Sequence, residues 1–187
     1  MDGCADDLRC EIGQVGKGLV ELLKKALCPA FVQDGGMILQ ASPWEEADYR
    51  IGVYLYDIQD YSFAAASGMM AGENKKRFPP KALELSYMIF CNEDVRFGGI
   101  RRDQIQMHLN EVGRTLHDFP AFETERGEEI QLSFSRETID FKIRLWGSFN
   151  RPLRPALYVR AVPVLVESDR IADLSRVGER DYRVGKK

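Results

Sequence analysis

The sequence lacks the features that membrane-inserted and secreted proteins carry. No apolar run approaches the roughly 18 residues that a membrane-spanning helix needs. The first ten residues contain three aspartates and no apolar stretch, so they do not have the pattern of a signal peptide. We therefore predict a protein that assembles in the cytoplasm and has no membrane partner.

Metal-binding and disulfide patterns are also missing. The two histidines, His108 and His117, do not have the i, i+4 spacing of a helical metal site. The four cysteines form no Cys-x-x-Cys pair: Cys4, Cys10, Cys28 and Cys91. We predict no metal and no cofactor, and we interpret the cysteines as small apolar side chains in a reducing compartment.

The chain has no excess of positive charge. Its formal net charge is −3 and its pI is about 5.5. Proteins that bind nucleic acid through bulk electrostatics need a positive field that displaces counterions. We therefore predict no nucleic-acid partner.

The 187 residues are enough for one domain with its own hydrophobic core. We predict a domain over residues 1–168 and a polar C-terminal tail over 169–187, because the tail has too few apolar residues to build a core. The predicted fold is α+β, a single-domain sandwich of a mixed, mostly antiparallel sheet of about five strands with three helices.

Periodicity places the elements of this fold. An apolar repeat typical of helices predicts helices over 6–27 and 103–118, and a third helix capped by Ser135. Alternating or β-branched runs predict strands over 37–41, 49–57, 81–91, 130–134 and 156–168. The third helix has an apolar stripe predicted to face the core: Ile139, Ile143, Trp146 and Phe149.

Three local features qualify these predictions. Glycines at 13, 16 and 18 weaken the first helix by up to about 1 kcal/mol each, so its first turns are expected to fray. Pro163 lies inside the last strand, which must therefore be an edge strand or carry a bulge. The connection over 58–78 is unusually long and is predicted to be disordered or used for contacts.

The residues form no catalytic constellation. His117 and Asp118 are neighbours on a helix, so their side chains point about 100° apart and do not form a dyad. The glycines of the first helix do not form a phosphate-binding loop, because they do not match GxxxxGK[ST] and no strand precedes them. We predict that the protein is not an enzyme.

Several modest motifs in a fixed order resemble one known family. Pro79-Pro80 precedes a strand of the form LxLxYxI, a helix ends in L-H-D-x-P at Leu116–Pro120, and IQLSFS follows. A helix containing Leu145-Trp146 and the run PALYVRAVPVLVES complete the pattern. Over residues 16–168 the chain resembles the tail-terminator, or cap, proteins of phage-tail-like contractile injection systems, a family long catalogued as of unknown function.

The resemblance implies a structural role. Such proteins form a ring, expected here to be a hexamer, on the baseplate-distal end of the particle and end the polymerisation of the inner tube and the sheath. The implied partners are further copies of this chain, the inner-tube protein and the sheath protein. Two alternatives stay open at this point: a small cytosolic enzyme with an unidentified pocket, and a phage neck or tail-completion protein.

We predict interaction residues in three places: the long loop, the last strand and the tail. Within the last strand, residues 156–168 are expected to form an edge that serves the subunit interface or sheath pairing. The full set is Tyr61, Phe63, Met69, Met70, Lys75, Lys76, Arg77, Arg160, Arg176, Arg180 and Arg183.

Overall fold

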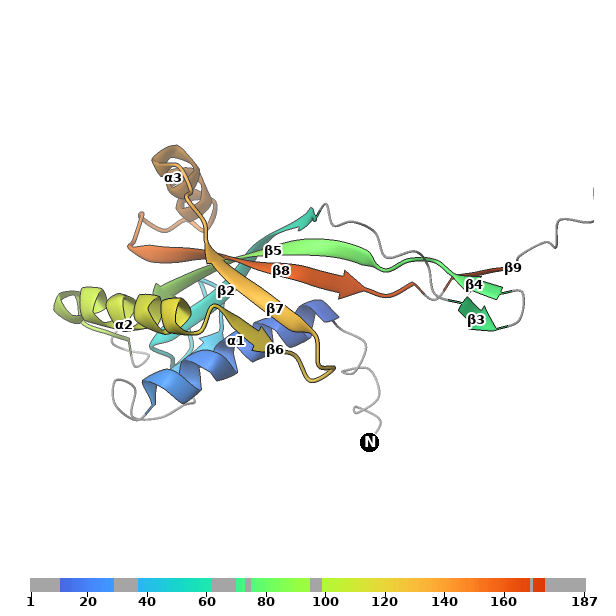
Figure 1. Ribbon diagram of the computed structural model, residues 1–187. Coiled ribbons are helices and arrows are strands. Elements are labelled where there is room, and N and C mark those ends of the chain that lie inside the picture. Colours follow the sequence, from blue (N-terminus) through green and yellow to red (C-terminus); the bar gives the residue numbers. More distant parts are fainter. Residues whose placement is uncertain are drawn as a thin grey trace, which may run out of the picture.

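The computed structural model describes residues 11–28, 37–61, 70–72, 75–94, 99–168 and 170–173 (Figure 1). Within them lie three α-helices, α1 (Glu11–Leu27), α2 (Ile105–Asp118) and α3 (Ile139–Ser148), and a 3-10 turn at Arg102–Gln104. The strands are β1 (Ile38–Gln40), β2 (Ile51–Asp60), β3 (Met70–Gly72), β4 (Lys75–Arg77), β5 (Lys81–Cys91), β6 (Ala121–Glu123), β7 (Glu129–Phe134), β8 (Ala156–Val166) and β9 (Ile171–Asp173).

The main sheet has six strands in the order β1-β2-β5-β8-β7-β6. Strand β1 pairs with β2 in parallel, and every other neighbour pair in this sheet is antiparallel. The predicted α+β fold with a mixed, mostly antiparallel sheet is confirmed. The predicted count of about five strands is one short, because β6 is only three residues long and its sequence reads as part of a polar turn.

Helices α1 and α2 cover one face of this sheet, and α3 covers part of the other (Figure 1). Strand β5 follows the predicted bounds and alternates between two cores. Leu85, Tyr87 and Ile89 join the α1/α2 side. Met88 and Phe90 join the α3 side. The alternation read from the sequence is therefore confirmed for this strand.

Helix α1 lies between the two edges of the sheet and contacts both β1 and β6. Its glycines allow this close approach. A Cβ atom on Gly18 would stand 2.3 Å from the ring of Phe122 in β6, and one on Gly16 would stand 2.8 Å from the side chain of Gln40 in β1. The described helix is continuous from Glu11. The glycines therefore do not delay the start of the described helix, whereas fraying of its first turns stays a prediction, and residues 6–10 lie outside the described part.

Strand β8 is not an edge strand, since β5 flanks it on one side and β7 on the other. The prediction of an edge at 156–168 is wrong. The alternative, a bulge, is confirmed: Leu83 pairs with Val164 and Leu85 pairs with Ala161, so one residue of β5 lies opposite two of β8 at Pro163. The bulge accommodates a proline in a central strand because the ladder is already interrupted there.

Helix α3 differs from its prediction at its start and along its stripe. The capping side chain is Thr138, which accepts a hydrogen bond from the backbone N–H of Phe141, and not Ser135. Trp146 is fully buried, but Ile139 and Ile143 are 59% and 52% exposed. Phe119, which follows the last turn of α2, is also exposed.

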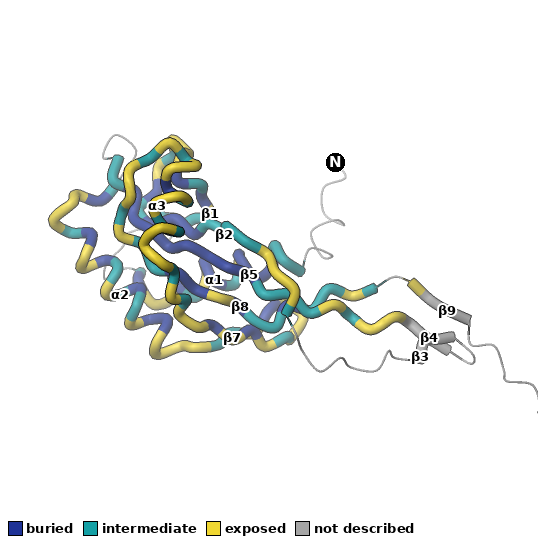
Figure 2. The backbone as a smooth tube through the Cα atoms, turned by 90° about the horizontal axis from the view of Figure 1, so that it is seen from above, coloured by how far each residue is buried: buried dark blue, intermediate teal, exposed yellow. Residues whose placement is uncertain are grey.

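An arm extends from the body at the start of β5 and the end of β8 (Figures 1 and 2). We use the term arm for β3, β4 and β9, which form a three-stranded antiparallel sheet, with the strand ends that lead to them. The chain passes from the arm into the main sheet between β4 and β5, and it returns from the main sheet to the arm between β8 and β9. Phe78 donates its backbone N–H to the carbonyl of Arg170, whose guanidinium lies 4.6 Å from the Phe78 ring centre. The sequence did not predict these strands, and the domain boundary at residue 168 stays a prediction.

Candidate interaction surfaces

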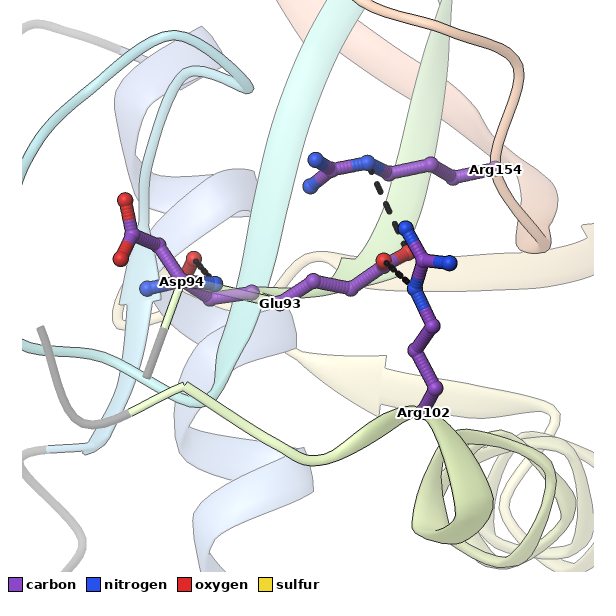
Figure 3. A network of polar contacts seen from close by, with 5 residues as sticks. Glu93, Asp94, Arg102 and Arg154 are labelled. Carbon is purple, nitrogen blue, oxygen red and sulfur yellow. Dashed lines mark hydrogen bonds and ion pairs between the residues drawn. The ribbon is translucent and has the colours of Figure 1, made fainter. Parts of the chain in front are cut away.

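The turn after β5 is a polar junction that ties three segments together (Figure 3). The carboxylate of Glu93 forms ion pairs with Arg102 and Arg154. Its oxygens lie 3.3 Å from Nε of Arg102 and 3.5 Å from Nε of Arg154. Asn92 donates its side-chain amide to the carbonyl of Tyr49, at 3.0 Å. Two guanidinium groups, one from the segment before α2 and one from the segment before β8, therefore balance the charge of the Glu93 carboxylate. These ion pairs hold the two segments at the turn, and the sequence analysis did not single out Glu93.

A second polar network fixes the start of α3 on the sheet. Tyr56 in β2 donates its hydroxyl to Glu137, 3.1 Å away, and Ser135 donates to the same carboxylate oxygen. Burial, followed by the Glu137 charge, raises the pKa of Tyr56 above its ordinary value. Tyr56 is therefore a neutral donor at physiological pH, and the network orders the linker between β7 and α3.

The residues considered for catalysis or metal binding do not come together. His117 and Asp118 are exposed at the end of α2. His108 is buried, with Nδ1 2.9 Å from the carbonyl oxygen of Gln104, one turn earlier in the chain. Burial raises the pKa of the Cys91 thiol to about 12, so it is protonated and unreactive at neutral pH. Within the described segments, no three His, Cys, Asp or Glu side chains are grouped to hold a metal ion.

Helix α3 presents apolar side chains to solvent. Ile139 and Ile143 are more than half exposed although they lie on the same stripe as Trp146, which is fully buried and donates its indole N–H to the hydroxyl of Tyr158, 3.3 Å away. Leu153, in the segment that follows the helix, is also exposed. Exposed apolar side chains grouped on one element are typical of an interaction surface.

A groove of about 650 Å³ runs between α1 and the edge strand β6. The helix contributes one face at helical spacing, including Gln14, Lys17 and Glu21. The other wall is β6 and the turn after it, including Phe122 and Glu125. The sequence analysis missed this groove because neither the closeness of β6 to α1 nor β6 itself was predicted.

The predicted interaction residues are distributed over the arm, the sheet and the tail. Tyr61 follows β2 and donates its backbone N–H to the carbonyl of Ala82. Met70 belongs to β3, and residues 75–77 form β4 of the arm. Arg160 lies on β8, 3.6 Å from Glu84 on β5. The remaining residues lie outside the described part: Phe63, Met69, Arg176, Arg180 and Arg183. None of these placements tests their role, which stays a prediction.

The described part of the chain contains no helix that is both long and apolar enough to span a bilayer. A search among curated proteins found none similar to this chain. Solved structures with the same fold were found. One is a cryo-EM structure of the sheath/tube terminator of an extracellular contractile injection system, PVC, in the extended state, with a TM-score of 0.67 at 15% identity. Another is the cryo-EM structure of the tube-terminating cap of the anti-feeding prophage, AFP, with a TM-score of 0.59 at 18% identity.

These two matches cover 94% and 91% of this chain, but only 64% and 60% of the chains that they match. This chain therefore spans less than two thirds of the length of either protein. Residues 14–179 match the Pvc16 N-terminal domain. That range includes the main sheet, α2, α3 and almost all of α1. The resemblance drawn from the sequence motifs is confirmed, and the chain belongs to the Pvc16 N-terminal domain family.

Proposed function

We propose that this protein is a structural terminator of a contractile injection particle. The observation that carries the proposal is the shared fold with the PVC sheath/tube terminator over 94% of this chain. The likeness to the AFP tube-terminating cap and the family match support the same role. The protein acts by binding, without catalysing a reaction.

In this proposal the protein forms a ring of six copies at the baseplate-distal end of the particle. Its partners are its own copies, the inner-tube protein and the sheath protein, and assembly takes place in the cytoplasm. A growing end presents the same contact surface to each new layer. A cap binds that surface once and offers no equivalent surface beyond it, so polymerisation stops. Each copy contacts the next head to tail, because only a heterologous contact whose rotation closes makes such a ring.

The surfaces described above fit contacts of this kind. We assign the arm, with Tyr61, Met70 and residues 75–77, to a neighbouring subunit or the tube. Arg160 lies on the sheet face that α3 leaves open, and its side chain is 45% exposed, which supports our assigning it to a partner contact. The tail arginines and the two loop residues outside the described part belong to the same proposal: Phe63, Met69, Arg176, Arg180 and Arg183.

The test is to assemble the particle with and without this protein and to measure particle lengths by negative-stain electron microscopy. Particles made with it should have one narrow length distribution, and particles without it should have a broad one. Length control that is independent of the protein contradicts the proposal. Light scattering on the purified protein tests the ring separately, since a hexamer has six times the 21.3 kDa mass of one chain.

A further inference from the structure

The groove between α1 and β6 has an open strand edge as one wall. Among the described residues, strand β6 is the last strand of the main sheet and pairs with β7 alone. The carbonyl of Pro120 and the N–H of Thr124 bond toward the β7 side. Backbone groups alternate in direction along a strand, so those of Ala121 and Glu123 point to the outer edge. An open edge of this kind can accept a further strand from another chain.

The helical wall contributes a buried polar group without a partner. The side chain of Gln14 is 6% exposed and lines the groove. Its Nε2 atom is buried and has no hydrogen-bond partner within the described residues. A buried amide donor without an acceptor is destabilising, because it has lost its hydrogen bonds to water.

The groove also has a preferred sign of charge. Its lining contains two lysines, Lys17 and Lys25, and twice as many glutamates: Glu21, Glu123, Glu125 and Glu129. A basic occupant is favoured over an acidic one. The N-terminal residues, with Asp2, Asp6 and Asp7, therefore match it poorly.

The chain has a basic segment of suitable composition at its C-terminus. Residues 174–187 contain five Lys or Arg residues against two acidic ones. Within them, Tyr182 and Val184 favour β structure and flank Arg183, so the three residues match the length of β6. Because β9 runs outward along the arm, its last residue, Asp173, is carried away from the groove of its own chain (Figure 1).

We propose that residues 174–187 of one copy add as a strand to the β6 edge of a second copy, in the groove against α1. This inference rests on the proposed ring, since it names the contact between successive copies. The donor is the arm side of one copy and the acceptor is the α1/β6 side of the next. The contact is therefore heterologous, as a closed ring requires.

Site-specific crosslinking of the full-length protein tests this contact. A p-benzoylphenylalanine at position 125 lies on the groove wall, and the same residue at position 46 lies in an exposed loop that precedes β2 and does not line the groove. Equal amounts of ¹⁵N-labelled and unlabelled protein are mixed, irradiated and digested. We expect position 125 to crosslink to peptides from 174–187 with mixed isotope pairs, and position 46 to give none.

Three outcomes overturn the proposal: no crosslink to 174–187, crosslinks only between peptides of the same isotope, or capture of residues 1–10 instead. The same-isotope result would mean that the tail binds its own chain. These outcomes are separate from the proposed function, because particles can keep a uniform length while the groove takes no tail. Length control that is independent of the protein, together with absence of the crosslink, would instead remove both.

Charge reversal gives an independent readout. Glu123→Lys should weaken self-association about tenfold at low salt, and Arg183→Glu combined with it should restore much of the loss, because the pair is exchanged. Glu46→Lys is the matched control and should leave association unchanged, since Glu46 is exposed outside the groove. Equal weakening by Glu123→Lys and Glu46→Lys would show that only net charge matters, and it would reject the groove as the site.

Discussion

The two faces of the main sheet are covered in different ways. On the first face, α1 lies across the sheet and contacts both edges, with Val15, Leu19 and Leu23 fully buried. On the second face, α3 contributes one fully buried side chain, Trp146, which meets Phe90 and Phe149 edge to face at 5.9 and 6.2 Å. The first core is mostly aliphatic and broad, whereas the second is aromatic and small.

The two helices therefore differ in how much of their apolar surface the core buries. Helix α1 uses its apolar face for the core. Helix α3 is anchored by Trp146 and leaves Ile139 and Ile143 in water. An apolar stripe that the chain does not cover is available to a partner, so we associate the exposed side chains of α3 with contacts and the buried apolar side of α1 with stability. The side of α1 that lines the groove with β6 is separate from that buried side and is the acceptor proposed above.

The largest effects should come from truncating the anchor of each face. Leu19→Ala should cost about 2–5 kcal/mol of unfolding free energy and Trp146→Ala about 3–5 kcal/mol, because each leaves a cavity. Urea denaturation followed by circular dichroism measures both. Hydrogen exchange should then distinguish them, with loss of protection across the sheet for Leu19→Ala and mainly within α3 for Trp146→Ala. Identical exchange patterns would mean that the two faces are one cooperative core.

Two glycines provide the next contrast. Gly18→Ala should destabilise the protein by about 1–3 kcal/mol, because its Cβ would meet the Phe122 ring. Gly147→Ala, in α3, meets nothing within 4 Å and should stabilise by up to about 1 kcal/mol through helix propensity. Thermal melts of the two variants should therefore shift in opposite directions. Adding Phe122→Ala should relieve the clash and recover part of the loss at Gly18.

The cap of α3 should have a smaller effect. Thr138→Ala removes the side-chain acceptor for the Phe141 N–H and should cost about 1 kcal/mol. Thr138→Ser keeps the hydroxyl and serves as the control, with stability close to that of the parent. Denaturant midpoints measure the difference. Equal losses for both substitutions would show that the methyl group of Thr138, and not its hydroxyl, supports the helix.

The smallest effect on stability is expected on the exposed stripe. Ile143→Ser should change the unfolding free energy by less than about 0.5 kcal/mol, since the side chain is already half in water. If α3 contacts a partner, the same variant should broaden particle lengths while it folds normally. Particle lengths like those of the parent protein would exclude α3 as a contact surface. A large loss of stability would contradict the view that Ile143 lies outside the core.

Local sequence patterns predicted the long elements well. The bounds of β5 match the structure, and α2 begins two residues after its predicted start and ends where predicted. What the patterns missed depends on contacts between distant segments. Strand β6 exists because it pairs with β7, and β4 because it pairs with β9, and three-residue strands carry no period of their own.

The same reason explains the errors at α3 and β8. Periodicity finds an apolar stripe, but whether Ile143 meets a core depends on how far the sheet extends beneath the helix. Pro163 allowed two interpretations, and only the register of β8 with β5 selects the bulge. The groove between α1 and β6 could not be predicted for both reasons: it depends on the pairing of β6 with β7 and on how α1 packs on the sheet. The family, in contrast, was recognisable, because its motifs lie mainly on the long elements.

The short connections from β4 to β5 and from β8 to β9 have a mechanical consequence. Tension applied at the arm and directed away from the body would pull β5 and β8 along their own axes. The hydrogen bonds that hold these strands to β2 and β7 lie perpendicular to the strands, so they would share the load in shear and would not open one after another. A subunit held by its arm would therefore transmit force directly into the centre of its sheet, where the ladders are longest.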